Sequence, residues 1–274
     1  GAMHYAASMP QSALIHVIKK AIDKATRPLL RDFGEVERLQ VSQKGTSDFV
    51  SNADIRTETI LMEELSVARK GWGFLTEESG EKDLERCEFR FVIDPIDGTT
   101  NFIHAIPYFC ISIAAQKRVG EAAFETIAGV IYDPIHDEMF VAEAGQGATL
   151  NHKKLRVSQR KEYPLLSTAS PHIGRKNLPE MHAAIESVCK QGGAIRCSGA
   201  AALDLAYVAA GRYDAIWYYH LKPWDWAAGA LLVTEAGGRV SGILPQHEAS
   251  LMASNAQVHD WLQQRLHAAA EACS

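Results

Sequence analysis

The stretch Asp94-Pro95-Ile96-Asp97-Gly98-Thr99-Thr100-Asn101-Phe102 is the most informative part of this 274-residue chain. It follows the apolar run 89–93, which predicts a buried strand that ends at Asp94. Two carboxylates then lie three residues apart on a tight turn, before a Gly-Thr-Thr step where a helix can begin. Acids at a strand end can hold a hard cation, and N–H groups at a helix start can hold a phosphate. The stretch therefore predicts a metal and a phosphate bound side by side.

The composition is that of an ordinary globular protein, with 47% hydrophobic and 22% charged residues. The net charge of -5 shows no overall basic balance, so we expect no direct nucleic-acid binding. Five scattered cysteines without CxxC spacing are typical of reduced thiols in a cytosol. No apolar run approaches the roughly 20 residues of a membrane span, and no signal peptide is visible. We therefore expect a cytoplasmic protein without a membrane partner.

The first half of the chain has an α+β pattern. Apolar residues at helical spacing predict an amphipathic helix from Pro10 to about Arg31, ended by Gly34. A loop and hairpin over 39–50 is expected to lead to a second helix that starts near Asp54. Strands are predicted at 74–75, 89–93, 109–116, 128–131 and 138–142.

The second half alternates strands and helices, which predicts a sheet covered by helices. We expect a boundary near residue 150, between an N-terminal α+β subdomain (1–150) and a C-terminal α/β subdomain (151–274). Helices are predicted at 179–190, 200–210, 226–235 and 258–270, and strands at 194–196, 215–218 and near 251.

Carboxylates follow apolar runs at four places, which are Asp54, Glu77-Glu78, Asp94 with Asp97, and Asp225. Acids brought together repel one another and their pKa values rise, which divalent cations relieve. Mg²⁺ prefers such oxygen ligands, and two metals can stabilise the attacking and leaving oxygens of a phosphoryl transfer. The alternative is that a strand-end Asp forms a turn or caps a helix, and the positions of Asp54 and Asp225 suit caps.

Several motifs together resemble the inositol monophosphatase family. The opening stretch is similar to its first signature, and Trp224-Asp225-Trp226-Ala227-Ala228-Gly229 with 234–238 is similar to its second. The segments 48–54 and 77–79 match two further family segments, and 199–214 resembles the bacterial members. Related phosphatases of 3′-phosphoadenosine 5′-phosphate and of fructose bisphosphate differ just after Asp-Gly-Thr, so Thr100-Asn101-Phe102 favours the inositol monophosphatase branch.

The resemblance implies a five-layer αβαβα sandwich, a homodimer, and a Mg²⁺-dependent, Li⁺-sensitive phosphatase. It implies one metal held by Glu77, Asp94 and the Ile96 carbonyl, a second held by Asp94, Asp97 and Asp225, and a looser third near Glu77. The implied catalytic residues are Thr99, Asp54 and Glu77, of which Thr99 and Asp54 orient the nucleophilic water. Asp54 is expected to accept a hydrogen bond from the Thr99 hydroxyl and so aim it at the water, or to take the proton of the water. The implied substrate-binding residues are Gly98, Thr99, Gly199, Ala200, Tyr218 and Asp225.

The expected reaction is hydrolysis of a small phosphorylated metabolite, with inositol 1-phosphate as first candidate, by metal-activated water. One position departs from the pattern, because Tyr218 stands where inositol-binding relatives commonly have Glu. A phenol can donate one hydrogen bond but carries no charge. Losing the Glu therefore predicts weaker or redirected inositol recognition, unless a neighbour substitutes for it. The alternatives are a phosphatase of a nucleotide or sugar bisphosphate, or a macromolecule-binding protein with secondary phosphatase activity.

Overall fold

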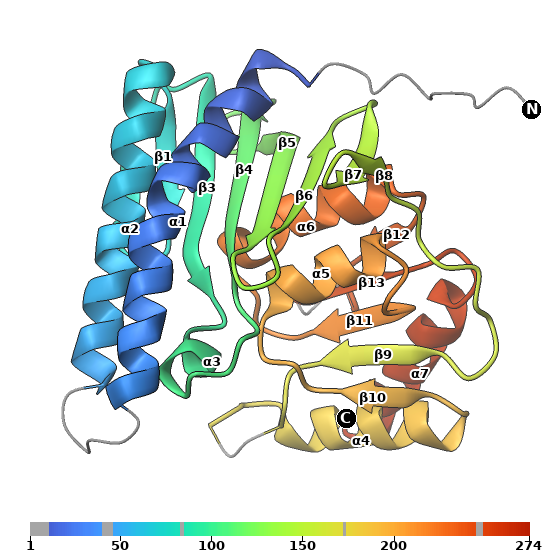
Figure 1. The fold of residues 1–274 in the computed structure, drawn as a ribbon. Helices are drawn as coiled ribbons and strands as arrows, with labels where there is room; N and C mark the ends of the chain where they lie inside the picture. The colour runs from blue at the N-terminus through green and yellow to red at the C-terminus, as the bar shows by residue number, and fades with distance from the viewer. Residues whose placement is uncertain (1–10, 40–45, 83–84, 172–173, 245–248) are drawn as a thin grey trace, which may run out of the picture.

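A computed structural model describes residues 11–39, 46–82, 85–171, 174–244 and 249–274. In this part of the chain, helices and sheets alternate in five layers, which confirms the predicted αβαβα sandwich (Figure 1). Three buried clusters of apolar side chains fill the spaces between these layers. No helix among the described residues is both long and apolar enough to cross a membrane.

The first layer is a pair of long helices, α1 (Ala13–Leu39) and α2 (Thr46–Ala68). Helix α1 was predicted to stop at Gly34, but it continues through Pro28 and Gly34. The reason is tertiary packing, since the Phe33 ring lies 5.4 Å and 5.0 Å from the rings of Phe102 and Phe109. Burial of this last part of the helix outweighs the local helix-breaking tendency of both residues.

The start predicted for α2 was also wrong, because the helix begins at Thr46 and already includes the segment before Asp54. Residues 40–45 of the predicted hairpin lie outside the described residues, as do the side chains of 46–49. Both helices pack one face on the first sheet, where Ile18, Ile22 and Leu61 are fully buried.

The second layer is an eight-stranded sheet in the order β2-β1-β3-β4-β5-β6-β7-β8. Only β1 and β3 are parallel, and the other neighbours are antiparallel. The strands are β1 (Gly73–Thr76), β2 (Gly80–Lys82), β3 (Phe89–Asp97), β4 (Cys110–Arg118), β5 (Phe124–Asp133), β6 (Glu138–Glu143), β7 (Gly147–Leu150) and β8 (Lys153–Lys154).

Strand β3 ends inside the stretch 94–102, and its pairing with β4 is irregular between Asp94 and Asp97. Pro95 lies inside this irregularity, where a residue without an N–H group is tolerated. The first signature is therefore a distorted strand end and not a separate tight turn. Gly98 then starts the short helix α3 (Thr99–Ile103) from a left-handed conformation with φ 94°.

The central layer holds α5 (Ala201–Ala209) and α6 (Pro223–Glu235), which lie between the two sheets (Figure 1). The fourth layer is a five-stranded sheet in the order β10-β9-β11-β13-β12. Its strands are β9 (Leu165–Thr168), β10 (Ala194–Arg196), β11 (Ala215–Tyr218), β12 (Arg239–Ser241) and β13 (Leu251–Ser254). Helices α4 (Leu178–Lys190) and α7 (His259–Ala272) cover its outer face. The division into subdomains near residue 150 stays a prediction.

Candidate active site

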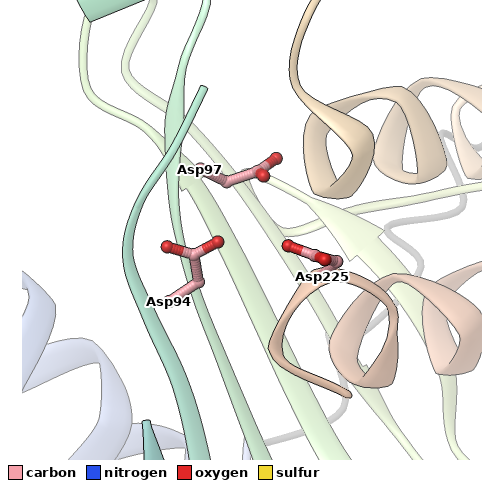
Figure 2. A group of neighbouring side chains, drawn as sticks. All are labelled: Asp94, Asp97 and Asp225. Atoms are coloured by element: carbon pink, nitrogen blue, oxygen red, sulfur yellow. The ribbon is translucent and has the colours of Figure 1, made fainter. Parts of the chain in front are cut away.

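Three carboxylates meet between the first sheet and the central helices. Asp94 and Asp97 come from the end of β3, and Asp225 comes from the first turn of α6. One carboxylate oxygen of each lies within 4.8 Å of one carboxylate oxygen of the other two. Figure 2 shows the three side chains gathered at one place. Residues separated by 128 or more positions in the sequence are therefore brought to one point by the packing of α6 on the sheet.

Each of the three side chains has a different hydrogen-bonding environment. Asp97 Oδ2 accepts the Ala202 N–H at 2.8 Å, which is one of the free donors at the start of α5. Asp225 Oδ2 accepts the Lys222 N–H at 2.8 Å, so Asp225 caps α6 and also belongs to the cluster. Asp94 Oδ1 is buried and has no hydrogen-bond partner among the described residues.

Burial and mutual repulsion make these three acids difficult to ionise. Burial and then the charge of Asp97 raise the pKa of Asp94 well above its usual value, and Glu77 and Asp225 add to this. Burial and then Asp225 raise the pKa of Asp97, against which the Ala202 N–H acts. Burial raises the pKa of Asp225 to about 6. Such a cluster is electrostatically unfavourable until a cation or protons compensate the charge.

Asp54 lies on α2 and is only 4% exposed. Burial raises its pKa to about 8, with further contributions from Glu78, Glu77 and Glu58. The buried Glu58, one turn further along the helix, accepts the Glu78 N–H at 3.1 Å and the Ser79 hydroxyl. Glu58 therefore holds the turn that carries Glu77, a residue that is itself exposed to solvent.

The Thr99 hydroxyl is bonded differently from the expectation. It donates to the Ile96 carbonyl oxygen at 3.1 Å, whereas the sequence analysis expected it to donate to Asp54. Asp54 Oδ1 has no hydrogen-bond partner among the described residues. The carbonyl oxygen has two lone pairs, so the bond from Thr99 leaves one lone pair on Ile96 for another ligand.

Two glycines among the predicted substrate-binding residues have positive φ angles and close neighbours. A Cβ atom at Gly98 would lie 3.0 Å from the Tyr108 carbonyl oxygen and 3.1 Å from Ala200 Cβ. A Cβ atom at Gly199 would lie 2.9 Å from the Asn101 side chain. The structure thus brings the Gly98 and Gly199 segments together without space for a side chain at either position.

Tyr218 is buried at the end of β11, and its hydroxyl donates to Asp204 Oδ2 at 2.6 Å. The single proton of the phenol is therefore used inside the protein. A direct contact of Tyr218 with substrate stays a prediction.

The donor set fits a hard divalent cation. Three carboxylates converge, and buried oxygens of Asp94 and Asp54 have no hydrogen-bond donor in the part of the chain that the structure describes. Mg²⁺ and similar ions take such oxygen ligands and neutralise the repulsion between them. No His or Cys belongs to the group of three, which makes a softer metal less suitable.

Three residues around the site were not predicted from the sequence, which are Glu58, Tyr108 and Asp204. Asp204 accepts hydroxyl hydrogen bonds from Tyr108 and Tyr218 and is fully buried. A usable signal was present, because Asp204 is the only charged residue in the apolar run 200–210. A buried charge in such a run requires partners.

The five layers and the buried acidic cluster define the class of metal-dependent phosphatases that the two signatures indicated. The family model described as "Inositol monophosphatase family" matches residues 10–274. The chain therefore belongs to the inositol monophosphatase family and is a phosphoric monoester hydrolase.

Individual proteins resemble the chain over most of their length. The chain is 47% identical over 235 residues to "Inositol-1-monophosphatase" of Mesorhizobium japonicum, covering 85% of this chain and 86% of the relative. It is 40% identical over 241 residues to "Nus factor SuhB" of Pseudomonas aeruginosa, covering 86% and 87%. The crystal structure of extragenic suppressor protein suhB from Bartonella henselae matches with a TM-score of 0.82 and 44% identity, covering 93% and 98%.

Proposed function

We propose that this protein hydrolyses small phosphate monoesters with Mg²⁺, and that inositol 1-phosphate is one of its substrates. The observation that carries the proposal is the convergence of Asp94, Asp97 and Asp225 within 4.8 Å. The name of the Mesorhizobium relative supports the inositol substrate. The proposed ligands are Glu77, Asp94 and the Ile96 carbonyl for one ion and Asp94, Asp97 and Asp225 for a second, with a third near Glu77. When bound, such ions stabilise the charge on the attacking, leaving and equatorial phosphoryl oxygens.

The protein's own groups bind the phosphate and orient the water. The N–H groups of Gly98 and Thr99 would bind the phosphoryl oxygens. With its proton donated to Ile96, the Thr99 oxygen can accept a hydrogen bond from the attacking water. Asp54, which would lose its proton when metal binds, would then take the proton that this water releases. The water oxygen forms a bond to phosphorus, the ester P–O bond breaks, and the leaving alkoxide takes a proton from solvent, to which Asp54 later gives up its own, so no phosphoenzyme forms.

Substrate choice is proposed to be broad. A Glu that would bond ring hydroxyls is replaced by Tyr218, and the phenol proton is donated to Asp204. Sites that hydrogen-bond a substrate hydroxyl discriminate strongly, and sites without such a partner discriminate weakly. Gly199 and Ala200 lie beside the Gly98 segment and are the remaining proposed substrate contacts.

The test is kcat/KM for inositol phosphates, glycerol 2-phosphate, nucleoside monophosphates and fructose 1,6-bisphosphate, with Mg²⁺, without it, and with added Li⁺. We expect Mg²⁺-dependent activity on several monoesters and inhibition by Li⁺. A preference of about 10³ for inositol 1-phosphate would contradict broad specificity. A preference for a nucleotide or for the bisphosphate would reassign the substrate, and no Mg²⁺-dependent hydrolysis of any of them would refute the proposal.

The remaining expectations are a homodimer and a cytoplasmic location. The scattered cysteines, all of them free thiols, support a reducing compartment. Sedimentation of the purified protein tests the dimer, because a monomer at micromolar concentration would contradict it.

A second candidate function is participation in a transcription complex, which the name of the Pseudomonas aeruginosa relative suggests. The intact acid cluster speaks against a protein that only binds. Asp97→Asn separates the two roles in cells. If this variant loses hydrolysis but still complements a deletion strain, the binding role is supported, and if complementation is lost with hydrolysis, the enzymatic role is supported.

A further inference from the structure

Asp204 is a buried carboxylate outside the metal cluster that accepts hydrogen bonds from three hydroxyl groups. It lies in the first turn of α5 and is 0% exposed. Its Oδ1 accepts the Tyr108 hydroxyl at 2.5 Å, and its Oδ2 accepts the Ser167 and Tyr218 hydroxyls, each at 2.6 Å. Hydrogen bonds to an ionised carboxylate are about twice as strong as neutral ones, so three of them can hold their donors firmly.

The three donors come from two parts of the fold. Ser167 is on β9 and Tyr218 is on β11, in the five-stranded sheet. Tyr108 lies in the segment between α3 and β4, next to the eight-stranded sheet. Asp204 therefore links the central helix α5 to both sheets at one point.

Asp204 is connected to the active site in two ways, along α5 and through Tyr108. Along α5, the Ala202 N–H donates to Asp97 Oδ2 at 2.8 Å. Through Tyr108, the backbone carbonyl accepts Asn101 Nδ2 at 2.8 Å, and Asn101 follows Gly98 and Thr99 in the first signature. Asn101 Nδ2 also donates to the carbonyl of Ser198, just before α5, at 2.8 Å.

We propose that Asp204 is a positioning residue, which sets the placement of Asp97 relative to the segment Gly98–Asn101 through α5 and Tyr108. Tyr218 acts in the same way, by donating to Asp204. This inference rests on the proposed function, because it assigns Asp97 to the metal and Gly98–Asn101 to the phosphate. Its physical basis is that a small misplacement of groups that bind the reacting atoms costs up to about a hundredfold in rate.

The test compares Tyr108→Phe, Tyr218→Phe and Asp204→Asn with a matched control at Asp214. Asp214 is also 0% exposed, and it accepts the Ser158 hydroxyl at 2.5 Å. Ser158→Ala therefore removes a hydroxyl donor from an equally buried carboxylate, whose contacts lead to β9 and to Arg160 and not to the site.

Two quantities are measured beside the Tm. They are the Mg²⁺ affinity of the metal-free protein by calorimetry, and kcat and KM for glycerol 2-phosphate. We expect Tyr108→Phe to lower kcat about tenfold and to weaken Mg²⁺ binding severalfold, with a smaller change in KM. Ser158→Ala is expected to lower the Tm without changing kcat or the Mg²⁺ affinity.

The outcomes separate this inference from the proposed function. If Tyr108→Phe and Tyr218→Phe keep wild-type kcat and Mg²⁺ affinity, or if Ser158→Ala loses them in proportion to its Tm, Asp204 is structural only and the inference is overturned. If the wild type binds Mg²⁺ but hydrolyses no phosphate ester, the proposed function fails. The Mg²⁺ affinities of the variants then still show whether Asp204 sets the placement of Asp97. If the wild type binds no Mg²⁺, both fail. The two Phe variants keep the test valid if Asp204→Asn does not fold.

Discussion

Asp97→Asn is expected to change stability and activity in opposite directions. The amide keeps an oxygen that can accept the Ala202 N–H, but it removes a charge within 4.8 Å of Asp94 and Asp225. At that separation each fully charged pair repels by about 3 kcal/mol with an effective dielectric constant of 20. The pKa values of Asp94 and Asp97 are raised, so protons on these carboxyl groups already reduce the repulsion. We therefore expect a gain of about 1–2 kcal/mol in the free energy of unfolding of the metal-free protein.

The assay is thermal unfolding near pH 8, with a chelator and with excess Mg²⁺, alongside kcat. A gain of this size raises the Tm of a chain this long by about 4 °C in the chelator. In Mg²⁺ the difference should shrink or reverse, because the wild type gains more from ligand binding than the variant. Losing one key electrostatic group should lower kcat about 10²–10³-fold.

The control is Asp214→Asn, the same substitution at a buried carboxylate that pairs with Arg160 at 2.8 Å. This variant should lose stability with and without Mg²⁺ and keep its kcat. An unchanged kcat in Asp97→Asn would show that the metal assignment is wrong. A lower Tm for Asp97→Asn in the chelator would show that repulsion in the cluster is not the dominant effect.

Three further predictions follow from local geometry. Gly98→Ala places a Cβ atom 3.0 Å from the Tyr108 carbonyl oxygen, at a residue with a φ of 94°. We expect the free energy of unfolding, measured by chemical denaturation, to fall by about 1–3 kcal/mol, and kcat to fall more than in a distal variant of equal Tm. A wild-type kcat would contradict this prediction. The pKa of Asp54 is raised from 3.8 to about 8, so this residue is largely protonated at pH 7 without metal. Mg²⁺ binding should therefore release protons, and the Mg²⁺ affinity should fall as the pH falls below 8. Calorimetry in buffers of different ionisation enthalpy measures the proton release, and its absence would refute the prediction. Gly229→Ala places a Cβ atom 2.5 Å from Leu205 between α6 and α5, so overpacking should cost about 1–3 kcal/mol; an unchanged unfolding midpoint would show that the two helices can separate freely.

Local pattern predicted most elements of the second half closely. The expected helix 179–190 is α4 at Leu178–Lys190, and the expected strands 194–196 and 215–218 are β10 and β11. These segments combine a clear period with turn residues at their ends, so local and tertiary preferences agree. The C-terminal end of α1 was predicted less well, because Pro28 and Gly34 are tolerated where Phe33 packs on other rings.

Asp94, Asp97 and Asp225, which the structure brings together, were singled out from the two signatures, but their hydrogen bonds were not predicted. The Thr99 hydroxyl donates to the Ile96 carbonyl, and Tyr218 donates to Asp204. Such bonds depend on side-chain rotamers and on neighbours far away in the chain, which residue order does not contain. Asp204 is the exception, because this acid interrupts an apolar run, and a buried acid needs hydrogen-bond donors.

The sequence by itself determined the chemistry that this protein can perform. Asp94, Asp97 and Gly98 stand next to one another on one strand end, so their chemical types and spacing are properties of the chain. Only the tertiary structure decided the geometry in which they act. Asp225 completes the cluster because α6 packs between the two sheets, and Tyr108 and Tyr218 meet at Asp204 because β11 and the segment before β4 face α5. The physical reason is that burial excludes water. Buried carboxylates without hydrogen-bond donors then repel one another strongly enough to require a cation, whereas a buried carboxylate with donors holds those donors in place.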